Sequence, residues 1–334
     1  MMIRVAVTES SAVAEARRQA GALAQSQGFP ENDEGRVKLV VTELATNIVK
    51  HGGGGDILVG SFEEPGAAGI HILALDSGPG ITRLQEALAD GYSTAGTAGG
   101  GLGAIVRQSE FAEVASWPGL GTAVLARLQP RKAGVGHSAP PSRWGAVLVA
   151  KPGEEVCGDC WSLHEGPGGA TILVADGLGH GPHAATASLE AVKVFQRHRD
   201  HSVATLLDYV HGGLRPTRGA AIAIAREHKA ERRLEFGGIG NIAGVIQGRA
   251  ASKHLVSLAG TAGHNARKIQ VFDYPFDGGL VILHSDGLGT SWSLDRYPGI
   301  TRMHPTLIAG VLVRDYWRQR DDVTVVVLRG EPSP

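Results

Sequence analysis

Hydrophobic positions in the first 130 residues follow both helical and strand patterns. One helical stripe predicts a helix that begins with Asp33 as N-cap and ends at glycines 52 to 55; its apolar members stand at positions 37, 40, 41, 44, 45 and 48. An earlier helix is predicted from Ser10 or Ser11 to about Gln27, and a short one at 104–108. Apolar runs predict strands at 3–7, 57–62, 70–75, 111–117 and 122–128. Because these elements do not strictly alternate, we expect a mixed sheet covered by helices on one face.

The second half has a denser strand pattern. Helices are predicted at about 182–197, with Pro182 in the first turn, and at 203–214. Apolar runs predict strands at 145–150, 170–175, 220–226, 242–246, 280–284 and 323–328. We therefore expect two packed sheets with helices outside them, and an α+β class for the whole chain.

A short polar segment separates the halves. Residues 130–143, PRKAGVGHSAPPSR, hold three prolines and two glycines and lack apolar periodicity. This composition is typical of an exposed linker. The 334 residues are enough for about two domains, which we predict at 1–129 and 144–331.

Composition and charge narrow the class of protein. Lys plus Arg number 32 and Asp plus Glu 33, giving a formal net charge of −1 and no basic excess for nonspecific nucleic-acid binding. Neither a signal-peptide core nor a run of ~20 apolar residues stands out, so we expect a cytoplasmic protein without membrane association. The two cysteines, Cys157 and Cys160, are too few for a disulfide framework or a four-cysteine zinc site. A redox role for the pair stays a minor alternative.

Three glycine-rich or polar motifs in the first half fit a nucleotide site. Glu43 and Asn47 are four residues apart and share a helix face. The strand that ends at Leu75 runs into residues 76–80, DSGPG, where a ligand can approach the backbone beside a carboxylate. Residues 99–103, GGGLG, precede a helix and offer free amides to phosphates. Each motif alone has a plain alternative, a solvated helix face or a turn, but the ordered set points to nucleotide binding.

The motifs ELATNIVKHG, DSGPGI and GGGLG resemble the N, G1 and G2 boxes of the GHKL ATPases, especially the RsbT-like anti-sigma-factor serine kinases. The resemblance implies a Bergerat-type α/β sandwich that binds ATP and Mg²⁺. It implies that Asn47 holds Mg²⁺, that Asp76 binds the adenine amino group and that Glu43 is the general base. Thr122 would support the adenine pocket. The implied cofactor-binding residues are Asn47, Asp76, Gly78, Gly80, Gly99, Gly101, Leu102, Gly103 and Thr122.

Acidic clusters at strand borders indicate a metal site in the second half. They are Gly158-Asp159, Asp176-Gly177, Ser285-Asp286-Gly287 and Asp321-Asp322. Carboxylates without nearby cysteine ligands suit Mg²⁺ or Mn²⁺, and two such ions can activate water and neutralise a phosphoryl group. Individually, Asp-Gly pairs are usually turns; four clusters at strand ends favour the metal interpretation.

The motifs EVCGDCW, VADGLGHG, HSDG and RDDVTVVV resemble the PP2C-like serine phosphatases of the RsbX/SpoIIE type. The resemblance implies an α-β-β-α sandwich with two Mn²⁺ or Mg²⁺ ions. Asp176 would bridge the ions and the Gly177 carbonyl would assist. Asp286 and Asp321 would ligate from the other side, Asp159 directly or through water, and Asp322 is a further metal-ligand candidate.

Together the resemblances imply a bifunctional partner-switching regulator: a serine/threonine kinase fused to a serine/threonine phosphatase, acting on an STAS-domain antagonist in sigma-factor or stressosome signalling. In one alternative, the first half is a nucleotide-gated binding module for a sigma factor or a separate phosphatase. In another, only the phosphatase is active and the first half senses ATP.

Overall fold

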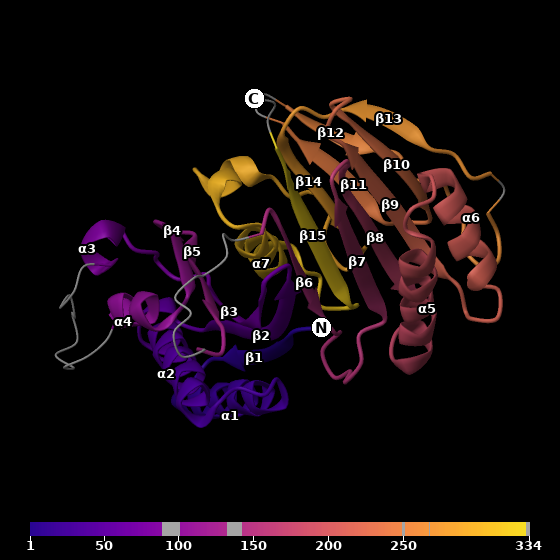
Figure 1. Ribbon diagram of the computed structural model, residues 1–334. Helices are drawn as coiled ribbons and strands as arrows, with labels where there is room; N and C mark the ends of the chain where they lie inside the picture. Colours follow the sequence, from indigo (N-terminus) through magenta and orange to yellow (C-terminus); the bar gives the residue numbers. More distant parts are fainter. Residues whose placement is uncertain (89–100, 132–141, 249–250, 267, 332–334) are drawn as a thin grey trace. The chain divides into compact units, whose positions relative to one another are not determined.

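The chain folds into two compact units in the computed structural model, which describes residues 1–88, 101–131, 142–248, 251–266 and 268–331 (Figure 1). The N-terminal unit comprises Met2–Ser142 together with Ser293–Arg314. The C-terminal unit comprises Met1, Arg143–Trp292 and Asp315–Pro334. A segment from late in the sequence therefore packs with the first half of the chain, which the predicted domain bounds do not include.

One five-stranded sheet forms the centre of the N-terminal unit, in the order β1-β2-β3-β5-β4. Its strands are β1 (Ile3–Val7), β2 (Gly55–Glu64), β3 (Ala67–Asp76), β4 (Phe111–Trp117) and β5 (Gly121–Leu128). The α+β class is confirmed, but the expected mixed sheet is wrong because all four strand pairings are antiparallel. Short turns join β2 to β3 and β4 to β5. The longer connection runs from β3 to β4, and β5 pairs antiparallel with both of these strands.

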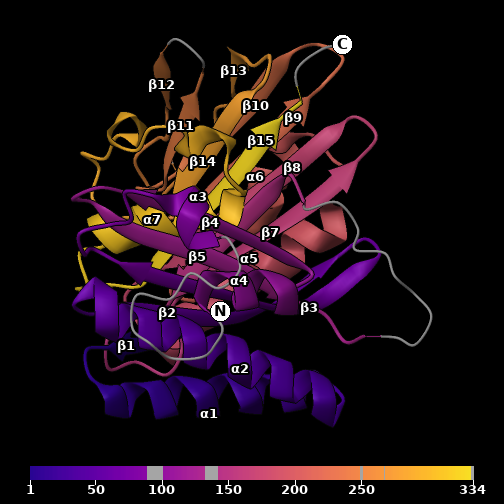
Figure 2. The same cartoon turned by 90° about the vertical axis from the view of Figure 1, so that its left-hand side faces the viewer.

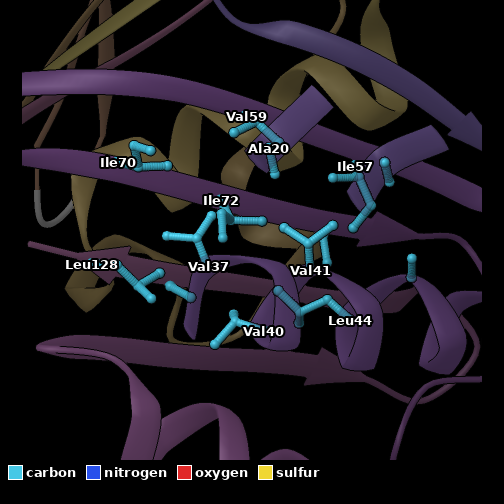
Figure 3. Close-up of a cluster of buried hydrophobic side chains, with 14 of the residues drawn as sticks. Ala20, Val37, Val40, Val41, Leu44, Ile57, Val59, Ile70, Ile72 and Leu128 are labelled. Atoms are coloured by element: carbon cyan, nitrogen blue, oxygen red, sulfur yellow. The ribbon is translucent and has the colours of Figure 1, made fainter. Parts of the chain in front are cut away.

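Helices α1 (Ser10–Ser26) and α2 (Glu31–Asn47) run side by side along one face of this sheet (Figure 2). The apolar stripe predicted for α2 is buried, with every member 2% exposed or less. Figure 3 shows Val37, Val41 and Leu44 packed with Ile57 and Ile72 of the sheet. The helical periodicity therefore identified the core-facing side of α2 correctly.

Asp33 is not the N-cap of α2, because the helix begins two residues earlier, after Pro30. The Asp33 side chain is buried, and its Oδ1 accepts from Arg36 Nη1 at 2.6 Å. Its Oδ2 accepts from the backbone amide of Arg131 at 2.8 Å. Arg36 also pairs with Glu110 at 2.6 Å. The Asp33 carboxylate thus links α2 to the residues after β5 and, through Arg36, to the residue before β4. These contacts explain why a polar side chain is buried at this position.

The opposite face of the same sheet is also buried, and the segment Ser293–Arg314 belongs to the same unit. Leu58, Leu73, Leu75 and Leu125 on this face are 1% exposed or less. Helix α7 (Pro305–Tyr316) packs here: a Cβ built on Gly310 would lie 3.2 Å from Leu73 Cδ1. Helices therefore cover both faces of this sheet, whereas the sequence predicted helices on one face only. Two 3₁₀ turns, Leu294–Arg296 and Ile300–Arg302, precede α7.

The C-terminal unit is the expected sandwich of two antiparallel sheets, ordered β13-β10-β9-β8-β7 and β12-β11-β14-β15-β6. The apolar layer between them includes Val174 and Phe236 from the first sheet and Leu283 and Val326 from the second. The strands are β6 (Trp144–Val149), β7 (Asp159–Gly166), β8 (Gly169–Gly177), β9 (Ala220–His228), β10 (Arg233–Ile239), β11 (Ala243–Gln247), β12 (Ser252–Leu255), β13 (Phe272–Pro275), β14 (Gly279–His284) and β15 (Val323–Gly330).

Two helices cover the first of these sheets (Figure 1). Helix α5 (Pro182–His198) packs on β7 and β8, and α6 (Val203–Gly213) packs on β9 and β10. Pro182 is at the start of α5, as predicted. Across the described residues, no helix has the length and apolar character needed to cross a bilayer.

Candidate nucleotide and metal sites

The helix that carries Glu43 and Asn47 changes from α-helical to π-helical geometry within the predicted N box. Helix α2 stops at Asn47, and residues Ile48–Gly52 form a π-helical turn. Such turns are rare and frequently occur at functional sites. Both Glu43 and Asn47 are partly buried, and their spacing of four places them on one side of α2.

The π turn brings the end of the N box into backbone contact with the DSGPG turn. A Cβ on Gly52 would lie 2.7 Å from the Asp76 Cβ, and a Cβ on Gly78 would lie 2.8 Å from the Gly52 Cα. Real Cβ atoms do not approach this closely, so only glycine fits at either position. Two motifs that are separate in sequence therefore meet in the structure.

Asp76, the last residue of β3, has one carboxylate oxygen held in place. Its Oδ1 accepts from the amide of Gly78 at 2.9 Å and from the amide of Thr122 at 3.2 Å. The Thr122 hydroxyl lies 2.9 Å from that of Ser116. Both hydrogen bonds that described residues donate to this carboxylate end on Oδ1, which leaves Oδ2 as an acceptor for a ligand.

Burial raises the pKa of Asp76 above the ordinary aspartate value. The amides of Gly78 and Thr122, followed by the charges of Arg314 and His51, oppose that rise. The site thus combines a half-buried acceptor with fixed donors, a setting that suits recognition of an amino group.

The third motif opens helix α4 (Gly101–Gln108), and Gly99 lies outside the described residues. The helix starts earlier than the predicted 104–108, so Gly101, Leu102 and Gly103 form its first turn. Amides in a first helical turn have no partner within the helix and favour anions. Helix α4 packs against α2, which places this turn near the helix that carries Asn47.

The acids at β7 and β8 stand opposite each other. Asp159 and Asp176 are partners in the antiparallel register. Burial raises the pKa of Asp159 to about 7, although the hydroxyl of Ser285 donates to its Oδ2 at 2.6 Å. Burial raises the pKa of Asp176 to about 9, and the charges of Asp159, Asp286 and Asp321 add to that rise. The structure therefore gathers acids from four separate stretches of chain.

Asp286 and Asp321 complete this group from the other sheet. The Asn241 side chain donates to Asp286 Oδ2 at 2.7 Å. Burial raises the pKa of Asp286, and the charge of Asp321 adds to this. Asp321 Oδ1 accepts from the amide of Asp322 at 2.9 Å. Neighbouring like charges raise one another's pKa. Although the charge of Arg318 opposes the rise at Asp286, the group as a whole is suited to cations.

Asp322 differs from its neighbours because both of its oxygens already accept backbone hydrogen bonds. They bind the amides of Lys151 and Gly158, each at 2.8 Å, and the side chain is 3% exposed. A structural role as anchor of the Gly158 turn accounts for this carboxylate. Its predicted role as a metal ligand stays a prediction.

Only glycine fits at position 177, because a Cβ there would lie 2.0 Å from the Ala184 carbonyl oxygen in α5. The predicted role of the Gly177 carbonyl at the metal ions stays a prediction. Its amide donates to the Gly158 carbonyl at 3.2 Å. Within the described ranges, no three Asp, Glu, His or Cys side chains are already arranged around one point as an ion requires. The donor chemistry nevertheless fits Mg²⁺ or Mn²⁺, since oxygen ligands from several carboxylates are what these ions prefer.

Three residues that contact the two sites were given no role from the sequence, although Ser285 stood within one of the acidic clusters. Ser285 holds Asp159, Asn241 holds Asp286, and Arg314 Nη1 donates to the Asp76 carbonyl oxygen at 2.8 Å. Ser285 stands beside Asp286, so its position in the HSDG motif was a usable signal. Asn241 and Arg314 have no local signal, because only the tertiary structure brings them to the acids.

The surroundings of the cysteine pair give no support to the redox alternative. Cys157 and Cys160 are free thiols. Burial is the main cause that raises the pKa of both thiols. Thiols with a raised pKa stay protonated and are poor nucleophiles, which favours a packing role.

Comparisons with known proteins agree with the first of the two resemblances. The model of the histidine kinase-like ATPase domain matches residues 6–128. The serine/threonine-protein kinase RsbT of Bacillus subtilis (strain 168) is 36% identical over 112 residues, which are 33% of this chain and 84% of that protein.

Solved structures also resemble the chain. One, described in the words “The bacterial stressosome: a modular system that has been adapted to control secondary messenger signaling”, has 27% identity and a TM-score of 0.52 over 56% of this chain and 98% of that one. RsbX in complex with magnesium has 19% identity and a TM-score of 0.49 over 56% of this chain and 94% of that one. The match to RsbT over most of that kinase's length is the decisive one: through residues 6–128, the chain belongs to the RsbT family of histidine kinase-like ATPase domains.

Proposed function

We propose that this protein is a bifunctional partner-switching regulator. Its N-terminal unit transfers a phosphoryl group from ATP to a serine or threonine, and its C-terminal unit removes such a group with divalent metal ions. The observation that carries the nucleotide half is Asp76, whose Oδ1 is fixed by two backbone amides while Oδ2 is left to accept from a ligand.

In the proposed kinase, each motif has one task. Asp76 accepts a hydrogen bond from the adenine amino group, and Asn47 holds Mg²⁺. The amides at Gly101 and Gly103 bind phosphate oxygens. Glu43 accepts the proton of the partner's serine or threonine hydroxyl. At the same time the hydroxyl oxygen attacks the γ-phosphorus of ATP, and ADP leaves.

In the proposed phosphatase, Asp159, Asp176, Asp286 and Asp321 hold two Mg²⁺ or Mn²⁺ ions. The ions would supply an activated water and neutralise the phosphoryl charge. The chain contributes the fixed positions of these acids: Ser285 orients Asp159, and Asn241 orients Asp286. The raised pKa values of Asp159 and Asp176 support the assignment, since cations relieve the repulsion behind them.

The proposed partner is an STAS-domain antagonist in sigma-factor or stressosome signalling. Similarity to a kinase named RsbT and to a structure whose description names the bacterial stressosome supports this class of partner. Having both units in one chain would give each a high effective concentration near the shared partner.

The proposal is tested with purified full-length protein and a candidate STAS-domain protein. We expect phosphate transfer with Mg²⁺-ATP, and release of that phosphate with Mn²⁺. ATP-dependent binding of the partner without transfer would contradict the kinase and favour a nucleotide-gated binding module. Hydrolysis that survives chelation would contradict the metal-dependent phosphatase.

A further inference from the structure

The segment Ser293–Arg314 lies in the phosphatase half of the sequence and packs within the nucleotide-binding unit. It is bracketed in the sequence by two predicted metal ligands, Asp286 and Asp321. The segment makes one contact with Asp76 itself and one with Trp117, and the residues that the segment contributes to these contacts lie outside the motifs of an ATPase domain.

The first contact is direct. Arg314 is the last residue of the segment, and its Nη1 donates to the Asp76 carbonyl oxygen at 2.8 Å. That oxygen lies where β3 ends, and a Cβ on Gly121 would come within 2.0 Å of it, so the surroundings are tight. A guanidinium bond at this point fixes the backbone from which the Asp76 side chain projects.

The second contact runs through Trp117. Its indole N–H donates to the Pro298 carbonyl at 3.0 Å, and its ring lies 5.2 Å from that of Tyr297. On the other side, a Cβ on Gly80 would lie 2.3 Å from the Trp117 carbonyl oxygen. The end of the DSGPG turn therefore rests on Trp117, which the segment holds in place.

Apolar packing keeps the segment on the sheet between these points. Gly310 of α7 lies against Leu73 and Leu75, the residues that lead into Asp76. The His304 amide donates to Glu113 Oε2 at 2.6 Å. The two ends of the segment, at Pro298 and Arg314, therefore lie at the end of the sheet where β4 and β3 finish.

We propose that Ser293–Arg314 is an integral part of the nucleotide site, in which Arg314 is a positioning residue that sets the Asp76 backbone for adenine recognition. This inference rests on the proposed ATP binding and deepens it. It places one determinant of ATP affinity outside the ATPase domain of the sequence.

The test compares full-length variants by calorimetric titration with ATP and GTP and by thermal unfolding. Arg314→Ala removes a hydrogen bond from a charged donor, so ATP affinity should fall by ~10-fold or more, and the preference for ATP over GTP should shrink with it. Arg314→Lys, which keeps one charged donor, should recover part of both. Arg302→Ala is the matched control, because Arg302 is an exposed arginine on the same segment.

A second variant guards against misfolding of the first. Trp117→Phe keeps the ring beside Tyr297 but removes the donor to Pro298, and it should also weaken ATP binding without a loss of folding. If both Arg314→Ala and Trp117→Phe keep the wild-type ATP affinity and the preference for ATP, this inference is overturned and the proposed function is not. Absence of ATP binding by the wild type would overturn the proposed function as well.

Discussion

At the scale of single residues, the nucleotide site depends on how the Asp76 carboxylate divides its two oxygens. Oδ1 is committed to the amides of Gly78 and Thr122. The sequence indicated Asp76 and Thr122, because an acid after a strand and a threonine after Gly-Leu-Gly are local patterns. It could not indicate Arg314, which is 238 positions away from the Asp76 carbonyl it binds.

Asp76→Asn should weaken ATP binding by ~10-fold or more, as for other hydrogen bonds to charged groups. The two fixed amides require an acceptor at Oδ1, so the new NH₂ would take the place of Oδ2 and face the adenine amino group, donor against donor. Calorimetry on the full chain measures this. Equal affinities for the variant and the wild type would mean that adenine binds elsewhere.

A buried charge cluster gives a second prediction at this scale. Arg36 is 9% exposed and pairs with Asp33 and Glu110. Arg36→Met would leave the buried Asp33 carboxylate and the partly buried Glu110 carboxylate without the guanidinium they share, so the free energy of unfolding should fall by about 3–5 kcal/mol.

Chemical denaturation checks this value, with Arg18→Met as the control. Arg18 forms an exposed pair with Glu15 on α1, and such pairs contribute little. Similar, small losses in both variants would show that the Arg36 cluster does not stabilise the fold.

At the scale of elements, the π turn after α2 decides whether the N box and the DSGPG turn can meet. The apolar stripe predicted α2 and its buried face correctly. It missed the start of the helix because Asp33 resembles a cap in sequence, while its carboxylate is used by Arg36 and Arg131. Nor does apolar periodicity indicate the π turn or the close approach of Gly52 to Asp76, which lies 24 positions further along the chain.

Gly52→Ala should therefore impair ATP binding, because its new Cβ would meet Asp76 at 2.7 Å. Gly35→Ala, in the preceding helix α2, is the matched control: beyond its chain neighbours and the helix's own backbone, no atom lies within 4 Å of its Cβ position. That control should keep ATP affinity and gain ~1 kcal/mol of stability, as Ala does over Gly in a helix. If both variants bind ATP like the wild type, the close approach has no functional role.

At the scale of the whole molecule, the order of segments along the sequence does not match their division between the two folded units. The proline-rich segment 130–143 marks a change of composition, but Ser293–Arg314 groups with the first 142 residues. The sequence could not show this, because a buried helix such as α7 has the same apolar pattern whichever sheet it covers. The five strands of the first sheet and the two-sheet sandwich were predictable, since apolar runs bounded by turns are local signals. Strands β7, β10, β12 and β13 were not predicted.

Residues 1–142 expressed alone should consequently be unstable. Without the late segment, Leu73 and Leu75 would lose their contact with α7, and each buried leucine is worth about 1.5–3 kcal/mol. Thermal unfolding and binding of a hydrophobic dye report this. A fragment as stable and as free of dye binding as the full chain would contradict the role of the segment.

The central claim, opposing activities on one phosphorylated partner, is tested most directly by one time course. The full chain is mixed with an STAS-domain protein, Mg²⁺, Mn²⁺ and radiolabelled ATP in limiting amount, and label on the partner is followed. We predict a rise and fall with the wild type, a lasting plateau with Asp176→Asn, and no label with Glu43→Ala. Label that appears equally with Glu43→Ala, or that decays equally with Asp176→Asn, would contradict the account.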